Sequence, residues 1–272
     1  MFDTHSHLNF SVFVNNVGEV IRRAKKAGVA NILVPGTDIE TSKKAVEIAQ
    51  KYSGVYAAVG IHPHHVYKIK NKKLKIKNIE GLLKNSKVVA IGEVGLDRHY
   101  YQKTKYGNYQ IDEEFINLQK MLLVEQIKLA IKHDKSLIIH NWEAKKDLLE
   151  IISEPVIAKA LVGKTVFHCC EPDEELLEFA KEHKIYIGVD GDVTYSKEKQ
   201  EFVKKIPLEL MVLETDSPYL MPEPIRQTKR FPNEPANIPI IADLIAKITS
   251  NSMIRIIEAT TNNAKKLFSI AT

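Results

Sequence analysis

The chain has few of the features that mark secreted, membrane-spanning or disulfide-stabilised proteins. Its two cysteines, Cys169 and Cys170, are adjacent, so a disulfide between them is implausible on geometric grounds. Free thiols fit a reducing compartment. No apolar run approaches the roughly 18 residues needed to cross a bilayer. The first apolar run begins at residue 2, which leaves no room for a signal peptide. We therefore expect a cytoplasmic protein that makes no membrane contact.

Strong charge and low-complexity segments are also missing. The formal net charge of the 272 residues is only +5, which permits a polyanionic partner without demanding one. Apolar residues make up 44% of the chain, enough to bury a sizeable core. No internal repeat or linker divides the sequence, so we predict one domain over residues 1–272. Nothing in the sequence indicates an obligate protein partner.

Short apolar runs recur along the whole chain and alternate with segments of helical periodicity, such as 16–28, 41–51 and 112–133. Alternating strands and helices imply parallel pairing. Eight such units in a little over 250 residues predict a (β/α)8 TIM barrel. A doubly wound open sheet is the alternative, but it would not naturally converge side chains from strands 1, 4, 5, 6 and 8. The eight runs span residues 2–7, 30–35, 55–61, 88–92, 136–140, 164–168, 185–188 and 210–214.

Potential metal ligands lie at or just past the ends of these runs. His5 and His7 are two residues apart, so in an extended strand they would project to the same side. A lone histidine beside an apolar run is more often a hydrogen-bonded structural residue. Six candidates at the carboxyl ends of strands, where barrel enzymes carry their active sites, favour a hydrolase instead. The six are His5, His7, Glu93, His140, His168 and Asp216.

The chain also resembles the TatD-type metal-dependent deoxyribonucleases, a branch of the amidohydrolase superfamily, from end to end. The resemblance rests on an ordered set of motifs. These are Asp3-Thr4-His5-Ser6-His7-Leu8, Gly60-Ile61-His62-Pro63-His64, Ile91-Gly92-Glu93-Val94-Gly95-Leu96-Asp97, Ile139-His140, Phe167-His168-Cys169, Tyr186-Ile187-Gly188, Glu214-Thr215-Asp216-Ser217-Pro218-Tyr219-Leu220 and Asn233-Glu234-Pro235.

The resemblance implies a two-metal site. His5, His7, Glu93 and Asp216 would surround one divalent ion, His140 and His168 would bind the other, and Glu93 would bridge them. Glu93 and Asp216 would be the catalytic carboxylates, with Asp216 placed to take a proton from the attacking water. Mixed imidazole and carboxylate ligands suit zinc or manganese, and the resemblance adds magnesium. The implied substrate is DNA, cut from a 3′ end on single-stranded or frayed strands.

Further residues are candidates for binding the substrate: His62, His64, Glu214, Trp142 and Arg230. His62 and His64 fit equally well as exposed loop imidazoles. Glu214 alternates with Asp216 and so shares its face. Trp142 stands where relatives commonly carry an arginine, so a phosphate-binding cation is missing there. The tryptophan would stack on a base or sugar, or pack under a loop.

Two other departures from the family pattern affect the loops. Cys169 is followed by Cys170-Glu171-Pro172 rather than Phe-Ser-Gly, and Pro232 replaces the arginine before Asn233. Arg226, Lys229 or Arg230 are possible replacements for that arginine. Glu234 could fix a loop on the catalytic face or cap the helix that follows it, and we expect the cap. His133 and His183 lie near predicted helix ends, which favours structural roles.

Basic and aromatic residues also mark two predicted inserted loops on the catalytic face. Lysines would track a phosphate backbone and tyrosines would stack on unpaired bases, although a charged run is usually a solvated surface. The first loop carries Lys68, Lys70, Lys72, Lys73, Lys75 and Lys77, and the second carries Tyr100, Tyr101, Lys103, Lys105, Tyr106 and Tyr109.

The sequence thus leads to a metal-dependent DNA hydrolase, with two alternatives. The same site would suit hydrolysis of an ester or amide, for example an aminoacyl ester on a tRNA or a small cyclic amide. A barrel that binds nucleic acid without catalysis is the other alternative, and the complete set of ligands argues against it.

Overall fold

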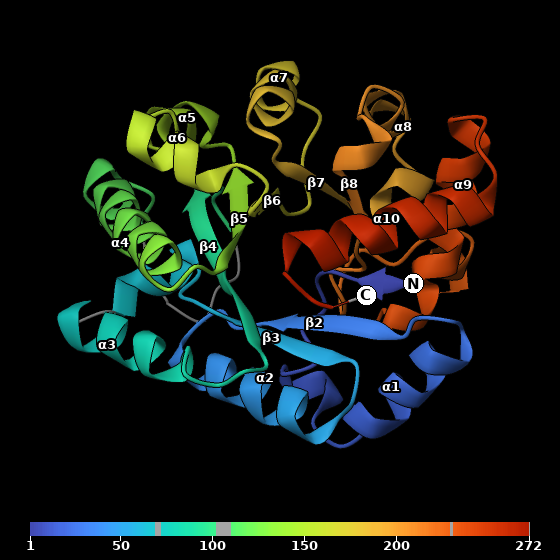
Figure 1. Ribbon diagram of the computed structural model, residues 1–272, viewed down its shortest axis with the longest axis horizontal. Helices are drawn as coiled ribbons and strands as arrows, with labels where there is room; N and C mark the ends of the chain where they lie inside the picture. Colours follow the sequence, from blue (N-terminus) through green and yellow to red (C-terminus); the bar gives the residue numbers. More distant parts are fainter. Residues whose placement is uncertain (69–71, 102–109, 229–230, 272) are drawn as a thin grey trace.

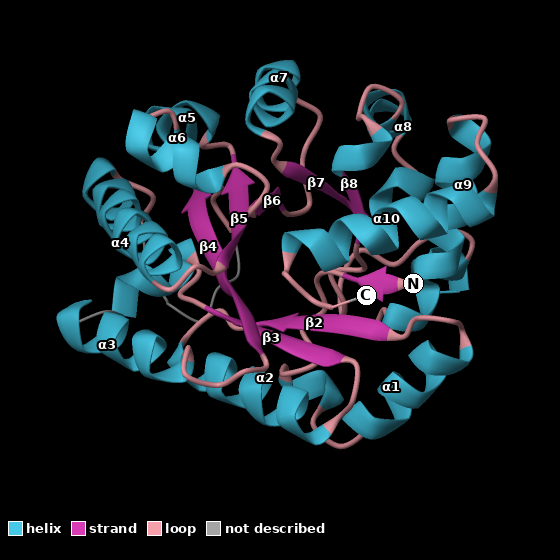
Figure 2. Ribbon diagram, in the orientation of Figure 1, coloured by secondary structure: helices cyan, strands magenta, loops and turns pink. Residues whose placement is uncertain are grey.

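Eight parallel strands pair in the order in which they occur along the chain, from β1 to β8. In the computed structural model, which describes residues 1–68, 72–101, 110–228 and 231–271, they form a barrel with the helices outside it (Figures 1 and 2). The predicted TIM barrel is therefore confirmed. The strands are β1 (Phe2–Asp3), β2 (Asn31–Pro35), β3 (Val55–Val59), β4 (Val88–Asp97), β5 (Ser136–Trp142), β6 (Thr165–Phe167), β7 (Tyr186–Val189) and β8 (Met211–Leu213).

The helices follow the strands around the outside of the barrel. Five of the ten in the described part of the chain begin at a side-chain cap: Asp38, Asp112, Asp173, Ser196 and Ser252 each accept a hydrogen bond from a backbone N–H of the first turn. The helices are α1 (Val17–Lys26), α2 (Ile39–Lys51), α3 (Lys72–Leu82), α4 (Glu113–Lys132), α5 (Lys145–Ile152), α6 (Pro155–Leu161), α7 (Glu174–His183), α8 (Lys197–Val203), α9 (Ile238–Ile248) and α10 (Met253–Leu267).

The strands separate two apolar layers because successive side chains point to opposite faces. In β2, Ile32 and Val34 face the outer core between strands and helices, whereas Leu33 faces the interior of the barrel. One residue from each strand fills that interior: Phe2, Leu33, Ala58, Ala90, Ile138, Val166, Tyr186 and Val212.

Helix α10 closes the amino-terminal end of the barrel. Its Ala264 and Leu267, together with Phe268, pack against the interior residues, and the carbonyl oxygen of Leu267 accepts a hydrogen bond from Ser136, the first residue of β5. This end is therefore closed mainly by apolar side chains, whereas the candidate ligands lie at the carboxyl end of the barrel.

The barrel closes between β8 and β1 through irregular backbone rather than through a long ladder. Thr4 N–H donates to Leu213, Asp216 N–H to His5, and His7 N–H to Ser217, at 3.0, 2.9 and 2.7 Å. Residues 4–7 and 213–217 thus hold the ring together. The first strand ends earlier than predicted, at Asp3. Beyond it, Thr4 and His7 donate their backbone N–H groups to Leu213, at the end of the chain's last strand, and to Ser217, which follows that strand.

Two other boundaries differ from the predictions. β4 does not end before Glu93 but continues to Asp97, since it pairs with β5 as far as the contact between Asp97 and Trp142. The predicted inserted loop at residues 68–77 is helical from Lys72 onwards, because Ile76 and Ile79 lie on one helical face against the outer core. Lys103, Lys105, Tyr106 and Tyr109 of the second predicted loop lie outside the described residues.

In the part of the chain that the structure describes, no helix combines the length and apolar character that a membrane span requires. The cytoplasmic location stays a prediction.

Candidate metal centre

Four of the predicted ligands meet at the point where the barrel closes. The Nε2 atoms of His5 and His7 lie 3.2 Å apart. Glu93 Oε2 is 3.6 and 3.5 Å from these two nitrogens, and Asp216 Oδ1 is 3.9 and 3.5 Å from them. Two imidazole nitrogens and two carboxylate oxygens therefore surround one small volume.

A second group of atoms faces the other oxygen of the same glutamate. Glu93 Oε1 is 3.2 Å from His140 Nδ1, 3.6 Å from His62 Nε2 and 3.9 Å from His168 Nε2. Glu93 therefore lies between two sets of histidines, one against each carboxylate oxygen. His168 also lies near the first group, with its ring stacked on that of His5 at 3.4 Å between centroids.

The spacing of these atoms fits divalent cations. Bonds of about 2.0–2.2 Å from a four-coordinate ion place its ligand atoms roughly 3.3 Å apart, and the first group spans 3.2 to 3.9 Å. Without an ion, one of the imidazoles of His5 and His7 can donate its Nε2–H to the other; with both Nε2 atoms unprotonated, the pair can bind a cation. Imidazole and carboxylate donors together suit zinc or manganese.

Asp97 contacts His140 on the side of the imidazole ring away from Glu93 and so orients it. Its Oδ2 is 3.0 Å from His140 Nε2, 3.0 Å from His64 Nε2 and 3.2 Å from the hydroxyl of Tyr101. In the neutral imidazole, this contact favours a proton on Nε2 and leaves Nδ1, the nitrogen that faces Glu93, to bind a cation. Such carboxylate–histidine contacts are typical of metal sites. Asp97 was not among the candidates from the sequence, although two-residue steps along a strand from Glu93 lead to it.

Glu214 plays the corresponding part for His168. Its Oε1 is 2.8 Å from His168 Nδ1 and accepts the N–H of Cys169 at 2.6 Å. Only 1% of Glu214 is exposed, so its position favours holding His168 over the substrate contact expected from the sequence. The carboxylate lies directly against Gly188 of β7, where a Cβ would come within 2.4 Å of Oε1. A glycine at this position makes room for Glu214.

The charges of the site follow from these contacts. Burial tends to raise the pKa of Glu93, but the surrounding imidazoles, first that of His62, hold it well below its usual range. Burial opposes protonation of His140 and His168, yet Asp97 and Glu93 raise the pKa of His140 to about 9. Glu214 raises that of His168 to about 10. Both imidazoles must lose a proton before the nitrogens that face Glu93 can bind a cation.

The remaining substrate-binding candidates are not gathered in one place. His62 borders the second group of atoms, whereas His64 is buried against Asp97. Trp142 lies at the end of β5 and is 37% exposed. Arg230 lies outside the described residues, as does Lys229. Arg226 is paired with Glu223 and stacks on Tyr195, with 4.3 Å between the guanidinium carbon and the ring centroid.

The loop that carries Asp216 is held by Asn233. Its Nδ2 faces the carbonyl oxygens of Thr215, Tyr219 and Leu220 at 2.9, 2.7 and 3.2 Å. The expected helix cap by Glu234 is wrong, because its side chain makes no capping hydrogen bond. Its carboxylate instead accepts hydrogen bonds from Arg23 Nε and Nη2 at 2.7 and 2.6 Å. Such a bidentate ionic contact is stronger than a hydrogen bond between neutral groups.

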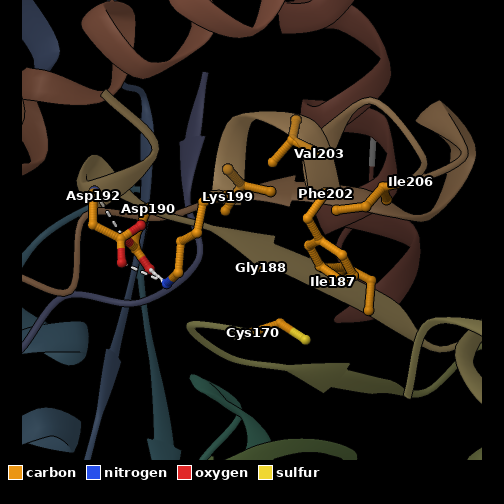
Figure 3. Close-up of a pocket in the computed structure, with 10 residues that line it drawn as sticks. Cys170, Ile187, Gly188, Asp190, Asp192, Lys199, Phe202, Val203 and Ile206 are labelled. Carbon is orange, nitrogen blue, oxygen red and sulfur yellow. Dashed lines mark hydrogen bonds and ion pairs between the residues drawn. The ribbon is translucent and has the colours of Figure 1, made fainter. Parts of the chain in front are cut away.

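A buried ionic cluster lies beside the site, between the loops after β6 and β7 (Figure 3). Lys199 Nζ is 2.5 Å from Asp192, 3.2 Å from Glu171 and 3.9 Å from Asp190. The side chain of Lys199 is 8% exposed. Sequence reasoning did not identify this cluster, because a lysine in a charged helix is usually solvated. It connects the helix α8 to the loop that begins at His168.

An eight-stranded parallel barrel that gathers imidazoles and carboxylates at its carboxyl end defines a metal-dependent hydrolase. The family model described as TatD related DNase matches residues 2–269, and the chain belongs to this family.

Similar proteins agree over the full length. An uncharacterized metal-dependent hydrolase, YabD of Bacillus subtilis, is 35% identical over 272 residues and covers 99% of each chain. The 3′-5′ ssDNA/RNA exonuclease TatD of Escherichia coli is 32% identical over 280 residues and covers 100% of each. The crystal structure of YjjV, a TatD homologue from E. coli, superposes with a TM-score of 0.87 at 27% identity, covering 100% of this chain and 98% of that one.

Proposed function

We propose that the protein is a deoxyribonuclease that shortens single-stranded or frayed DNA from the 3′ end by means of two divalent ions. The observation that supports it best is the position of Glu93, whose two oxygens face separate groups of histidines. His5, His7 and Asp216 would complete one ion site, and His140 and His168 the other. The exonuclease named TatD in E. coli, at 32% identity, supports the direction and the substrate.

Two bound divalent ions would position a phosphodiester, activate a water molecule and neutralise charge on both the attacking and leaving oxygens. The residues of the chain would do the rest. Asp216 would take the proton of the water as its oxygen attacks phosphorus. The bond from phosphorus to the 3′ oxygen of the remaining strand would break, and that oxygen would take a proton from solvent water. The products would be a nucleoside 5′-monophosphate and a strand shortened by one nucleotide. His62, beside Glu93, would contact the phosphate.

The test is single-turnover degradation of 5′-labelled single- and double-stranded DNA by chelated protein, repeated with Mg²⁺, Mn²⁺ and Zn²⁺. We expect a ladder of 3′-shortened products that requires a metal and prefers single strands. Asp216→Asn should lower the rate about 10²- to 10⁴-fold. Asp243→Asn, which neutralises a carboxylate on the outer helix α9, is the matched control and should leave the rate unchanged.

Other outcomes separate the alternatives. Two tightly bound ions without DNA cleavage, together with turnover of aminoacyl-tRNA or simple esters, would replace the nuclease with an esterase or amidase. Tight oligonucleotide binding without turnover under any of the ions would indicate a binding protein. If the double variant Glu93→Ala, Asp216→Ala still cleaved DNA as the wild type does, the proposed site itself would be wrong.

A further inference from the structure

The only tryptophan of the chain lies at the mouth of the candidate metal centre. Trp142 is two residues beyond His140 in β5, so both side chains project to the same side of the strand. At about 3.3 Å per residue, its Cα lies roughly 7 Å further toward the open end of the barrel. The residue is 37% exposed, so a large apolar side chain remains in contact with water next to the proposed reaction site.

The neighbours of Trp142 hold the ring in place. Its carbonyl oxygen accepts the N–H of Arg98 at 2.9 Å. The ring of His99 lies 4.9 Å from it at an angle of 35°, and Tyr101 approaches it edge-on at 6.1 Å. His99 is itself fixed by Glu143, with 2.8 Å between Nδ1 and Oε1. The tryptophan therefore has its orientation set before any ligand arrives.

This aromatic group is connected to the metal centre. The hydroxyl of Tyr101 donates to Asp97 at 3.2 Å, and Asp97 is also the partner of His140. The backbone N–H of His99 donates to the other oxygen of Asp97 at 2.8 Å. One buried carboxylate thus orients both a proposed ion ligand and the residues that support Trp142. A group stacked on Trp142 would lie at a fixed distance from the ions.

We propose that Trp142, supported by His99, is a stacking surface for one unpaired nucleobase next to the phosphate that is cleaved. This inference rests on the proposed nuclease function and deepens it. Every base has an aromatic face, so stacking would tolerate any sequence. A base within a duplex is already stacked and paired, so only an unpaired base can occupy the ring. The stacking surface would therefore select frayed or single-stranded ends.

Fluorescence tests the contact directly because Trp142 is the only tryptophan. Chelated wild-type protein, which cannot turn over, is titrated with a single-stranded hexanucleotide. The same strand with an abasic 3′-terminal nucleotide, a strand with an internal abasic site and a blunt duplex are the comparison ligands. We expect quenching by the intact single strand and at least fivefold weaker quenching by one of the two abasic strands. Equal quenching by all ligands would overturn the proposal.

Kinetics with variants provide the second test. Trp142→Ala should raise KM for a single strand about tenfold, within the range expected for one stacked base, with a smaller change in kcat. Trp142→Phe should restore most of the loss. Ile254→Ala, at an exposed apolar position on the outer helix α10, is the control. Circular dichroism and bound-metal content establish that each variant is folded and loaded.

The two proposals fail in different ways. If wild-type protein degrades DNA and Trp142→Ala has an unchanged KM for intact and abasic strands, the stacking surface is refuted and the nuclease stands. If wild-type protein degrades no DNA and shows no quenching with DNA, both are refuted. Quenching by single strands without turnover would support the stacking surface and reject the nuclease.

Discussion

Replacing Asp97 with asparagine should weaken the second ion site without touching a ligand. Asp97 is fully buried, and its Oδ2 lies 3.0 Å from the Nε2 atoms of both His64 and His140. Burial tends to raise the pKa of Asp97, but these two imidazoles hold it well below its usual range. The carboxylate is therefore charged, and it keeps one proton of His140 on Nε2, so that the proton lost on metal binding is the one on Nδ1.

Asparagine keeps the shape of the side chain but presents only one acceptor oxygen. If its NH₂ faces His140, the imidazole moves its proton to Nδ1, which can then no longer bind a cation. Loss of such outer contacts typically lowers metal affinity 10- to 100-fold, or about 1.4–2.7 kcal/mol. We expect a loss in this range for the ion next to His140 and less than a threefold change for the ion next to His5 and His7.

Calorimetric titration of chelated protein with Mn²⁺ or Zn²⁺ measures both affinities. Asp112→Asn is a matched control, since Asp112 caps α4 by accepting the N–H of Phe115 at 2.8 Å and asparagine caps equally well. An unchanged affinity at both sites, or an equal loss at both, would refute the orienting role of Asp97.

Three further predictions follow from the contacts around the site. Folded His140 and His168 hold protons up to about pH 9 and 10, whereas in the unfolded chain they lose them near pH 6.5. Their contribution to the stability of metal-free protein is therefore complete below pH 6.5 and lost as pH rises through 9 to 10, while affinity for the second ion rises over the same range. Thermal melts from pH 6 to 10 measure the stability, and metal titrations over the same range measure the affinity. If neither changed with pH, the raised pKa values of the two histidines would be contradicted. Gly188→Ala should displace Glu214 and lower the affinity for the ion next to His168 about tenfold. The same metal titration measures this affinity, and a value equal to that of the wild type would contradict the prediction. Lys199→Met leaves buried carboxylates unpaired and should cost about 3–5 kcal/mol in urea unfolding. Adding Asp190→Asn and Asp192→Asn should recover at least half of this loss, and no recovery would argue against the ionic cluster.

The strands and the gathering of the candidate ligands were predictable because each has a local signal. Short apolar runs with helical segments between them mark the eight strands, and a histidine or carboxylate at the end of a run marks the site. His5, His7, His140, His168, Glu93 and Asp216 lie together as the barrel geometry requires. Where local hydrogen bonding decides a boundary, as for β1 and β4, the prediction was less accurate. Apolar runs do not show where a ladder ends.

The supporting residues were harder to predict because their roles are contacts between distant segments. Asp97 lies 43 residues from His140, Glu214 lies 46 residues from His168, and Lys199 joins loops from two different strands. Only the folded barrel brings these groups together. The wrong prediction for Glu234 has the same origin, because Arg23 is far away in the sequence and adjacent in space.

The position of the proposed first ion site has a consequence for stability. His5, His7 and Asp216 lie on the two irregular segments that close the barrel through the hydrogen bonds of His7 to Ser217 and Asp216 to His5. An ion bound by these residues would therefore cross-link the first and last strands. A ligand that binds only the folded state stabilises it by about 2.7 kcal/mol at 100 times its Kd. The ion would do this at the place where the ladder is shortest, so metal binding and closure of the barrel are expected to be coupled.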